Sequence, residues 1–430
     1  MHVSQKPIGL WSAVSMGIGA MVGAGIFALL GEASAIAGSA VYISFIIGGV
    51  IALFSAYSLG KLGAAFPSSG GLIEYLTQSY GIGYFSGVMS IMLYFSALVS
   101  LSLIAEAFAN YAMTFLPQQA STLWHPALTT AIVLLFVLIN LKGAKDVAFW
   151  ERLTVAIKFL VLSALSVAGI FFMKPALLAT SHYPPINFIF YSLAVTFFAF
   201  EGFRVITNTA EDMPNPAKTL PKAMMLAVVF VMLLYVAIAF AVFGNLAVEK
   251  VIAAKDFALA ESALPVFGKI GFTVVTITAL IATASAINAN LYAVTNVTYH
   301  LAKDGELPQA FGYPIAHSRE GLVISGVLVI VMSLLFKLNE IAAIGSISVL
   351  FVHAVTHLGH FKVINRTGAS KILVLLAFLS CAIAIVLSLS YVYGRSSHII
   401  VILCAFLVIA VVTEVLLQKV KNRQVKPRIV

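Results

Sequence analysis

The stretch Met16–Gly31, "MGIGAMVGAGIFALLG", stands inside an apolar run long enough to cross a membrane. It contains Gly17, Gly19, Gly23 and Gly25. Each glycine inside a helix costs about 1 kcal/mol relative to alanine, and a segment in a bilayer must still satisfy all its backbone hydrogen bonds. The cluster therefore indicates either close packing against another helix or a local unwinding that turns backbone groups towards a cavity.

The whole chain has the composition of a membrane protein. Of its 430 residues, 61% are hydrophobic and 10% are charged, and the mean hydropathy is +1.05. Too few polar groups are present to cover a soluble globule. The net charge of +9 does not indicate a nucleic-acid partner, because Lys and Arg fall in short clusters between apolar runs. The expected partners are the lipid bilayer and small molecules, and the oligomeric state is left open.

Apolar runs of roughly 20 residues, the length that spans a bilayer, predict an all-α integral membrane fold with about twelve transmembrane helices. The runs lie near residues 9–34, 40–62, 83–116, 127–143, 147–173, 187–210, 220–245, 267–302, 321–336, 338–361, 371–393 and 397–418. Their even number places both termini on one side. Because most Lys and Arg outside the runs lie in loops on that side, the positive-inside rule predicts cytoplasmic termini and a multi-pass protein of the cell (plasma or inner) membrane.

The first and sixth runs are both interrupted by glycine and polar residues near mid-depth. They are five helices apart, and an odd offset inverts one copy relative to the other. Such interruptions in two inverted halves point to the binding site of a transporter. We therefore predict a ten-helix core over residues 1–365, with repeats at about 9–173 and 187–361, followed by two extra helices and a basic tail over 366–430.

The sixth run contains two ionisable residues, Glu201 and Arg204, in "FFAFEGFR". An ionisable residue within a membrane segment is expected to have a function, so Glu201 is a candidate functional residue. Arg204 is three positions further on and within reach of Glu201 on a helix. The alternative is an ion pair that only holds the segment in place.

Lys158 lies about a third of the way along the fifth run. Its long side chain could snorkel to the cytoplasmic interface. The alternative is a buried amine, which could load and release a proton during a transport cycle because burial disfavours the charged form.

In the tenth run, "FVHAVTHLGHF" places His353, His357 and His360 on one stripe of a helix. Metal binding or pH sensing is conceivable for such a stripe. The segment has no carboxylate or cysteine, so we expect the histidines to form hydrogen bonds with a neighbouring helix near the inner interface. Cys381 and Cys404 lie in separate runs and offer no ligand spacing. No metal or other cofactor is therefore predicted.

The loops of the chain are short and carry no catalytic motif. They contain no GxSxG, P-loop or HExxH pattern and no paired carboxylates. The chain is therefore predicted not to be an enzyme.

Three segments resemble hallmark motifs of the amino acid–polyamine–organocation superfamily of permeases. They are "GIGAMVGAGIF", "FFAFEGF" followed by "NTAEDMPNPAKTLPKA", and "LAKDGELP". In order and identity they are similar to those of prokaryotic proton-coupled amino acid transporters of broad specificity. The resemblance implies the LeuT-type fold of five plus five inverted helices, with helices one and six broken and the substrate bound between them.

The resemblance also implies which residues bind the substrate. In that family the carboxylate meets amides of the broken first helix, which here follow Gly23 and belong to Ala24, Gly25 and Ile26. The ammonium meets carbonyls before the break and in the sixth helix, where an aromatic side chain closes the site. Carried over to this chain, the remaining substrate-binding residues are Ala20, Met21, Phe198, Glu201 and Gly202, with Phe198 as the gate. Many relatives have uncharged or acidic residues where this chain has Glu201 and Arg204, so the resemblance leaves the choice of substrate open.

In the proton-coupled branch, a lysine on the fifth helix takes the place that sodium holds in related carriers. Lys158 stands at the matching position, where it would face the Gly19 carbonyl and Ser285. The implied function is import of neutral L-amino acids by proton symport with alternating access. Exchange of amino acids or amines on the same fold is one alternative. A second is sensing of an amino acid without transport, which would need a soluble domain or a long tail through which to signal.

Overall fold

The computed structural model describes residues 8–68, 70–117, 122–142, 147–305 and 307–420, which are nearly all helical. The long helices are α1 (Leu10–Ala37), α2 (Val41–Ala65), α4 (Tyr84–Met113), α5 (Trp124–Lys142), α6 (Val147–Phe171), α9 (Pro216–Phe243), α12 (Leu264–Asp304), α14 (Leu338–Thr367), α15 (Lys371–Arg395) and α16 (His398–Val420).

Shorter elements connect them. The α-helices are α3 (Leu72–Tyr80), α7 (Ile186–Tyr191), α8 (Leu193–Thr196), α10 (Val248–Ala253), α11 (Ala258–Glu261) and α13 (Glu320–Leu335). The 3₁₀ helices are η1 (Gly38–Ala40), η2 (Pro175–Leu178), η3 (Thr180–His182), η4 (Phe197–Asp212), η5 (Lys255–Phe257) and η6 (Gln309–Gly312). The strands β1 (Pro314–Ile315) and β2 (Ser318–Arg319) form a small antiparallel hairpin.

Ten segments of the described chain are long and apolar enough to cross a membrane. Two shorter apolar segments are Leu10–Gly23, which is the part of α1 up to its kink, and Glu320–Leu335, which is α13. The predicted all-α membrane fold is therefore confirmed. The count of twelve spans stays a prediction, because Glu320–Leu335 has 16 residues, fewer than the roughly 20 that usually cross a bilayer.

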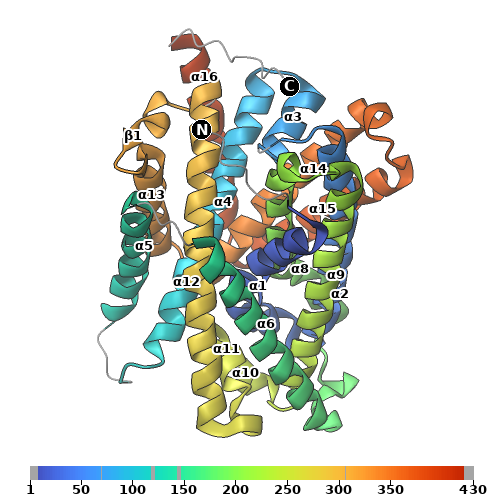
Figure 1. Ribbon diagram of the computed structural model, residues 1–430. Helices are drawn as coiled ribbons and strands as arrows, with labels where there is room; N and C mark the ends of the chain where they lie inside the picture. The colour runs from blue at the N-terminus through green and yellow to red at the C-terminus, as the bar shows by residue number, and fades with distance from the viewer. Residues whose placement is uncertain (1–7, 69, 118–121, 143–146, 306, 421–430) are drawn as a thin grey trace.

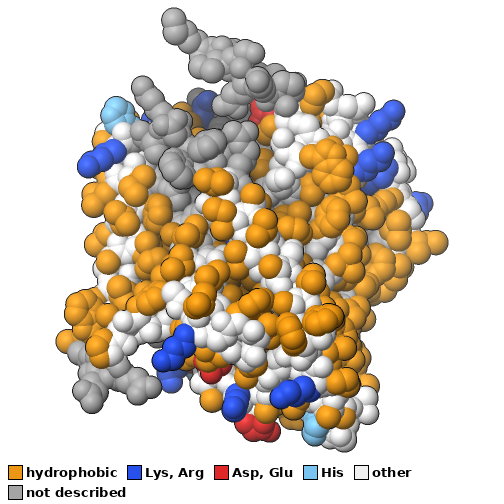
Figure 2. Space-filling view, turned by 60° about the horizontal axis from the view of Figure 1, so that its bottom comes forward, with side chains coloured by type: hydrophobic (Ala, Val, Ile, Leu, Met, Phe, Trp, Pro, Cys, Tyr) orange, Lys and Arg blue, Asp and Glu red, His pale blue; other side chains and the backbone are white. Residues whose placement is uncertain are grey.

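The long helices pack into one bundle, and α12 extends over most of its height (Figure 1). The helix α3 and the β1–β2 hairpin lie at one end of the bundle, whereas α10 and α11 lie at the other (Figure 1). Figure 2 shows hydrophobic side chains over the middle of one face and charged side chains gathered towards its ends. This distribution is typical of a helical bundle whose middle is surrounded by lipid.

The first interrupted run is kinked rather than unwound. Helix α1 is helical throughout except at Val22, where φ is −80° and ψ is 27°. The predicted unwinding of the first helix is thus limited to one residue. The sixth run consists of α7, α8 and η4, and a 3₁₀ helix of 16 residues is unusually long. The interruption of the sixth run is therefore spread over all of η4.

The 3₁₀ geometry sorts the side chains of η4 into rows, because residues i and i+3 overlie one another. Row one holds Phe197, Phe200 and Phe203; row two holds Phe198, Glu201 and Arg204; and row three holds Ala199, Gly202 and Val205. An α-helix, with 3.6 residues per turn, would mix these rows. The aromatic, polar and small residues of η4 therefore face different neighbours.

Glycines allow α1 and the small-residue row of η4 to touch through their backbones. A Cβ atom at Gly202 would lie 2.6 Å from the backbone nitrogen of Met21. A Cβ atom at Gly25 would lie 2.6 Å from the carbonyl oxygen of Ala199. Neither distance leaves room for a side chain, so this close approach requires glycine at both positions. The glycines of α1 therefore serve close packing at the same place where the helix is interrupted.

Tyr235 of α9 compensates for the kink in α1. Its hydroxyl lies 2.8 Å from the carbonyl oxygen of Met21, before the kink, and 3.2 Å from that of Ala199 in η4. The backbone N–H of Ile26, after the kink, donates to the same hydroxyl. In a regular helix, the Met21 and Ile26 groups would take part in the i to i−4 bonds next to Val22. One buried side chain thus satisfies backbone groups on both sides of the kink.

We expect Tyr235→Phe to lower the apparent melting temperature of the purified protein. The change keeps the ring and removes only the hydroxyl, which leaves buried backbone groups unsatisfied at a cost of about 1–3 kcal/mol each. Tyr292→Phe on α12 is the control, because Tyr292 is 62% exposed. Equal melting temperatures for the two variants in the same detergent would show that the hydroxyl does not support the kink.

Candidate functional site

Two small cavities lie between α1, η4 and α12. The first, which we call the core cavity, has a volume of about 20 Å³. It is lined by Ala20, Met21 and Gly25 of α1, by Phe198, Ala199, Glu201 and Gly202 of η4, by Ser100, Leu103 and Ile104 of α4, and by Asn290 of α12. This volume holds about one water molecule, so the accessible space of the cavity is smaller than an amino acid.

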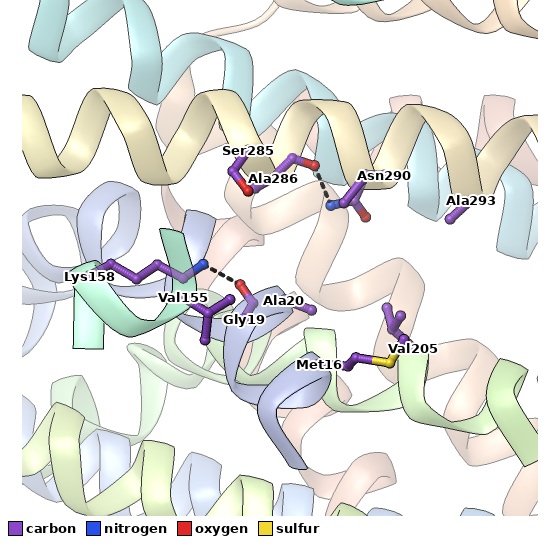
Figure 3. A pocket seen from close by; sticks show the side chains of 11 residues that line it. Met16, Gly19, Ala20, Val155, Lys158, Val205, Ser285, Ala286, Asn290 and Ala293 are labelled. Carbon is purple, nitrogen blue, oxygen red and sulfur yellow. Dashed lines mark hydrogen bonds between the residues drawn. The ribbon is translucent and has the colours of Figure 1, made fainter. Parts of the chain in front are cut away.

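The second cavity, which we call the lysine cavity, has a volume of about 40 Å³ and shares Ala20 and Asn290 with the core cavity. It is lined by Met16, Gly19 and Ala20 of α1, by Val155 and Lys158 of α6, by Val205 of η4, and by Ser285, Ala286, Ala289, Asn290 and Ala293 of α12 (Figure 3).

Lys158 is buried in the wall of the lysine cavity, with 2% of its surface exposed. Its Nζ donates a hydrogen bond of 2.5 Å to the carbonyl oxygen of Gly19 (Figure 3). Gly19 lets α6 come this close, because a Cβ atom there would lie 2.7 Å from Cγ2 of Val155. Ser285 of α12 lines the same cavity. The amine therefore reaches the backbone of α1 shortly before its kink and does not snorkel to an interface.

Glu201 both lines the core cavity and pairs with Arg204. Its Oε1 accepts a hydrogen bond from Arg204 Nε, and the two side chains are only 7% and 15% exposed. Two buried charges are tolerated when each compensates the other. The pair therefore places a compensated carboxylate at the wall of the core cavity.

Phe198, the predicted gate, rests on α14. It is buried in the wall of the core cavity, and a Cβ atom at Gly345 of α14 would lie 2.5 Å from its Cζ. The ring is therefore in contact with the α14 backbone, and a movement of α14 would change the space available to the gate.

Some predicted binding residues do not line the core cavity. Gly23 faces α12, where a Cβ atom would lie 2.8 Å from that of Ala286. Ile26 is fully buried and gives its N–H to Tyr235. The side chain of Ala24 lies outside the described residues. Because α1 is kinked only at Val22, the turn after the kink remains helical and does not present all its amides to the cavity.

Sequence reasoning missed two polar residues, Tyr235 and Asn290. Asn290 borders both cavities, and its Nδ2 donates a hydrogen bond of 2.8 Å to the carbonyl oxygen of Ala286 (Figure 3). The available signal was the presence of single polar side chains in apolar runs, which is weak because such residues often only join helices.

Two histidines of the α14 stripe, His357 and His360, form the predicted hydrogen bonds with the neighbouring helix α2, whereas His353 has no hydrogen-bond partner in the described structure. His357 bonds to Ser55 and Ser58, and His360 also bonds to Ser58. All of these side chains are fully buried. Within the described ranges, no group of three side chains is placed to hold a metal ion.

Known proteins resemble the chain over most of its length. The amino acid permease family matches residues 8–412. The chain is 33% identical over 425 residues to an uncharacterised protein of Methanocaldococcus jannaschii, with 98% of each chain covered. It is 32% identical over 420 residues to the inner membrane transport protein YbaT of Escherichia coli, with 97% of each covered.

A more distant relative is the serine/threonine exchanger SteT of Bacillus subtilis, which is 26% identical over 322 residues, 71% of this chain and 70% of SteT. The family match includes both interrupted segments, α1 and η4. Together with the membrane-spanning helices, these similarities show that the chain belongs to the amino acid permease family of the amino acid–polyamine–organocation superfamily and is a multi-pass membrane transporter, not an enzyme.

Proposed function

We propose that the chain imports neutral L-amino acids together with protons, by alternating access. The observation that carries this proposal is the hydrogen bond between the buried amine of Lys158 and the Gly19 carbonyl, next to the core cavity. The proposal includes cytoplasmic termini, since the basic loops favour that orientation. It also includes two inverted repeats, about 9–173 and 187–361, whose broken helices are α1 and η4.

The substrate would be held mainly by backbone groups of α1 and η4. Its ammonium would face Glu201 and the carbonyls of Ala20 and Met21, and its carboxylate would meet the amide of Gly25 beyond the kink. The ion pair of Glu201 and Arg204 carries no net charge, which favours a zwitterion over a charged substrate. Because the core cavity holds only about one water, its walls must move apart for the substrate to enter.

Lys158 would couple the proton to this movement. The protonated amine donates a charge-assisted hydrogen bond to α1 and so braces α1 against α6. Loss of the proton weakens that bond and shifts the population towards the inward-open state. The proton therefore leaves Lys158 towards the cytoplasm, the side on which the substrate is then released.

A first prediction concerns substrate binding. We expect some of the neutral L-amino acids to raise the melting temperature of the purified protein, because a ligand present at 100 times its Kd stabilises the folded state by about 2.7 kcal/mol. Thermal-shift assays with each of the twenty amino acids measure this effect. No shift with any of them would count against the proposed binding site.

A second prediction concerns proton coupling. We expect Lys158→Ala, reconstituted in liposomes, to lose uptake driven by an imposed pH gradient while it still exchanges internal for external amino acid. Lys222→Ala is the control, because Lys222 is exposed on α9. Full pH-driven uptake by Lys158→Ala would refute the coupling role. Exchange without dependence on the pH gradient in the unmodified protein would favour an exchanger, the activity named for the relative SteT.

A third prediction separates the two roles of Glu201. We expect Glu201→Gln alone to lower the melting temperature, because breaking one side of a buried ion pair costs about 3–5 kcal/mol. The double variant Glu201→Gln with Arg204→Gln should regain much of that loss, since no unpaired charge remains. If Glu201 binds the substrate ammonium, the double variant should nevertheless lack the amino-acid thermal shift. A normal shift in the double variant would make the pair purely structural.

A further inference from the structure

The histidine stripe of α14 is part of a continuous, buried chain of hydrogen bonds. The chain runs in the order Cys381, Ser55, His357, Ser58, His360 and Thr367. Cys381 Sγ lies 3.5 Å from Ser55 Oγ, and Ser55 Oγ lies 3.0 Å from His357 Nε2. Ser58 Oγ lies 2.9 Å from His357 Nδ1 and 2.8 Å from His360 Nδ1, and His360 Nε2 lies 2.8 Å from Thr367 Oγ1. All its members except Thr367 are fully buried. Thr367 ends α14 and precedes the exposed Gly368. The chain thus connects the core to the end of α14.

The direction of every bond follows from Thr367. Its hydroxyl has one proton, which it donates to the Ile364 carbonyl oxygen at 3.0 Å, so it accepts from His360 Nε2–H. A neutral His360 then accepts at Nδ1 the only proton of Ser58. Ser58 in turn accepts from His357 Nδ1–H. All donors therefore point towards Thr367.

The same argument fixes the other end of the chain. With its proton on Nδ1, a neutral His357 accepts at Nε2 from the Ser55 hydroxyl. Ser55 is then free to accept from the Cys381 thiol. This arrangement satisfies each of these groups with neutral side chains.

We infer that this chain is a proton relay that connects the region beside η4 with the end of α14, which the proposed topology places at the cytoplasmic side. The Ser55 hydroxyl first turns its proton towards Cys381 Sγ, which frees the lone pair of His357 Nε2. A proton that reaches Nε2 then forms an N–H bond there, and the Nδ1–H proton passes to Ser58. Ser58 passes its own proton to His360 Nδ1, the Nε2–H proton passes to Thr367, and Thr367 releases its own proton to water at the partly exposed end of α14. At each group one bond to hydrogen forms and one breaks, so no charge stays in the chain. Rotation of the hydroxyls and exchange of the tautomers restore the starting state.

His353 marks the inner end of this path. It lies one turn before His357 on α14, with 6.0 Å between the ring centroids. It is fully buried, and neither ring nitrogen has a hydrogen-bond partner in the described structure. Phe197 and Phe203 of η4 pack against it at 6.0 and 5.7 Å between centroids. These two aromatics therefore control whether the His353 ring turns towards His357.

The relay rests on the proposed proton symport, and η4 would link it to the substrate. Row two of η4, with Phe198 and Glu201, borders the core cavity, while row one holds His353 in place. Any movement of η4 that admits a substrate therefore also moves the groups around His353. The relay would open only when η4 shifts, which is the condition for coupled rather than free proton flow.

Charged and titratable groups of the neighbouring elements also face the relay. Arg204 of η4 acts on His353 electrostatically, and Cys381 of α15 bonds to Ser55. Tyr80 of α3 donates to the carbonyl oxygen of Val355. On α14 itself, Lys362 lies over the Tyr80 ring and Arg366 over the Phe66 ring. The Arg204 charge is compensated by Glu201.

Glutamine substitutions distinguish a relay from simple joining of helices. A glutamine amide can donate and accept hydrogen bonds but cannot take up a proton on one side and release one on the other. His357→Gln and His360→Gln should therefore keep α2 and α14 together while they interrupt the relay. Ser58→Ala is a second way to interrupt it, and His398→Gln, whose ring is 57% exposed, is the matched control.

The experiment uses the full chain in liposomes, with a pH dye inside and a tritiated mixture of the neutral L-amino acids as the probe. We expect the three relay variants to exchange amino acids within about twofold of the unmodified protein, and to lose about tenfold or more of the amino-acid-driven proton flux. Because the groups act in series, the double histidine variant should be no worse than either single one.

Three results would overturn the relay, and they differ in what they say about symport. Full proton flux in the relay variants removes the relay and leaves symport intact. A parallel loss of exchange and proton flux shows that the chain only holds helices together. Absence of amino-acid-driven proton flux in the unmodified protein refutes proton symport itself, and the relay with it.

Discussion

A backbone group without a partner is costly inside a bilayer, and the kink at Val22 creates such groups in the middle of α1. Two side chains from different helices form hydrogen bonds with this part of α1. The Tyr235 hydroxyl bonds to the Met21 carbonyl, and the Lys158 amine bonds to the Gly19 carbonyl, two residues earlier. The tyrosine donor does not change at physiological pH, whereas an amine can gain or lose a proton. The two supports of α1 thus differ in the one property that proton coupling needs.

The walls of the core cavity also explain how one site could accept several amino acids. Along α1 and η4, close approach at Gly25 and Gly202 brings backbone groups to the cavity, and under the proposed function these would recognise the ammonium and carboxylate that all amino acids share. Under the same proposal, side-chain selection would fall to the α4 wall, where Leu103 and Ile104 line the cavity together with Ser100. This mainly apolar wall favours uncharged side chains, in keeping with a neutral substrate.

The sequence predicted the parts of this site that depend on local pattern and family motif. Interrupted runs identified α1 and η4, and an ionisable residue in an apolar run identified Lys158, which is buried against Gly19 in the structure. Tyr235 and Asn290 were not predicted as site residues, because their contacts depend on which helices are neighbours. A single polar residue in an apolar run does not show which helix lies beside it. The extent of the break in α1 was not predicted for the same reason. The Tyr235 hydroxyl bonds to the Met21 carbonyl beside the kink, and α1 departs from helical geometry only at Val22.

The 3₁₀ geometry of η4 directs its three rows of side chains towards different neighbours. With three residues per turn, the small residues of η4 lie against α1. Phe198 and Glu201 line the core cavity, and the row of Phe197, Phe200 and Phe203 faces away from that cavity. Helix α14 touches two of these rows, through Gly345 against Phe198 and through His353 between Phe197 and Phe203. A regular α-helix in place of η4 would rotate the rows out of register within two turns. The unusual helix type is therefore what lets one segment contact the core cavity and His353 of α14 at once.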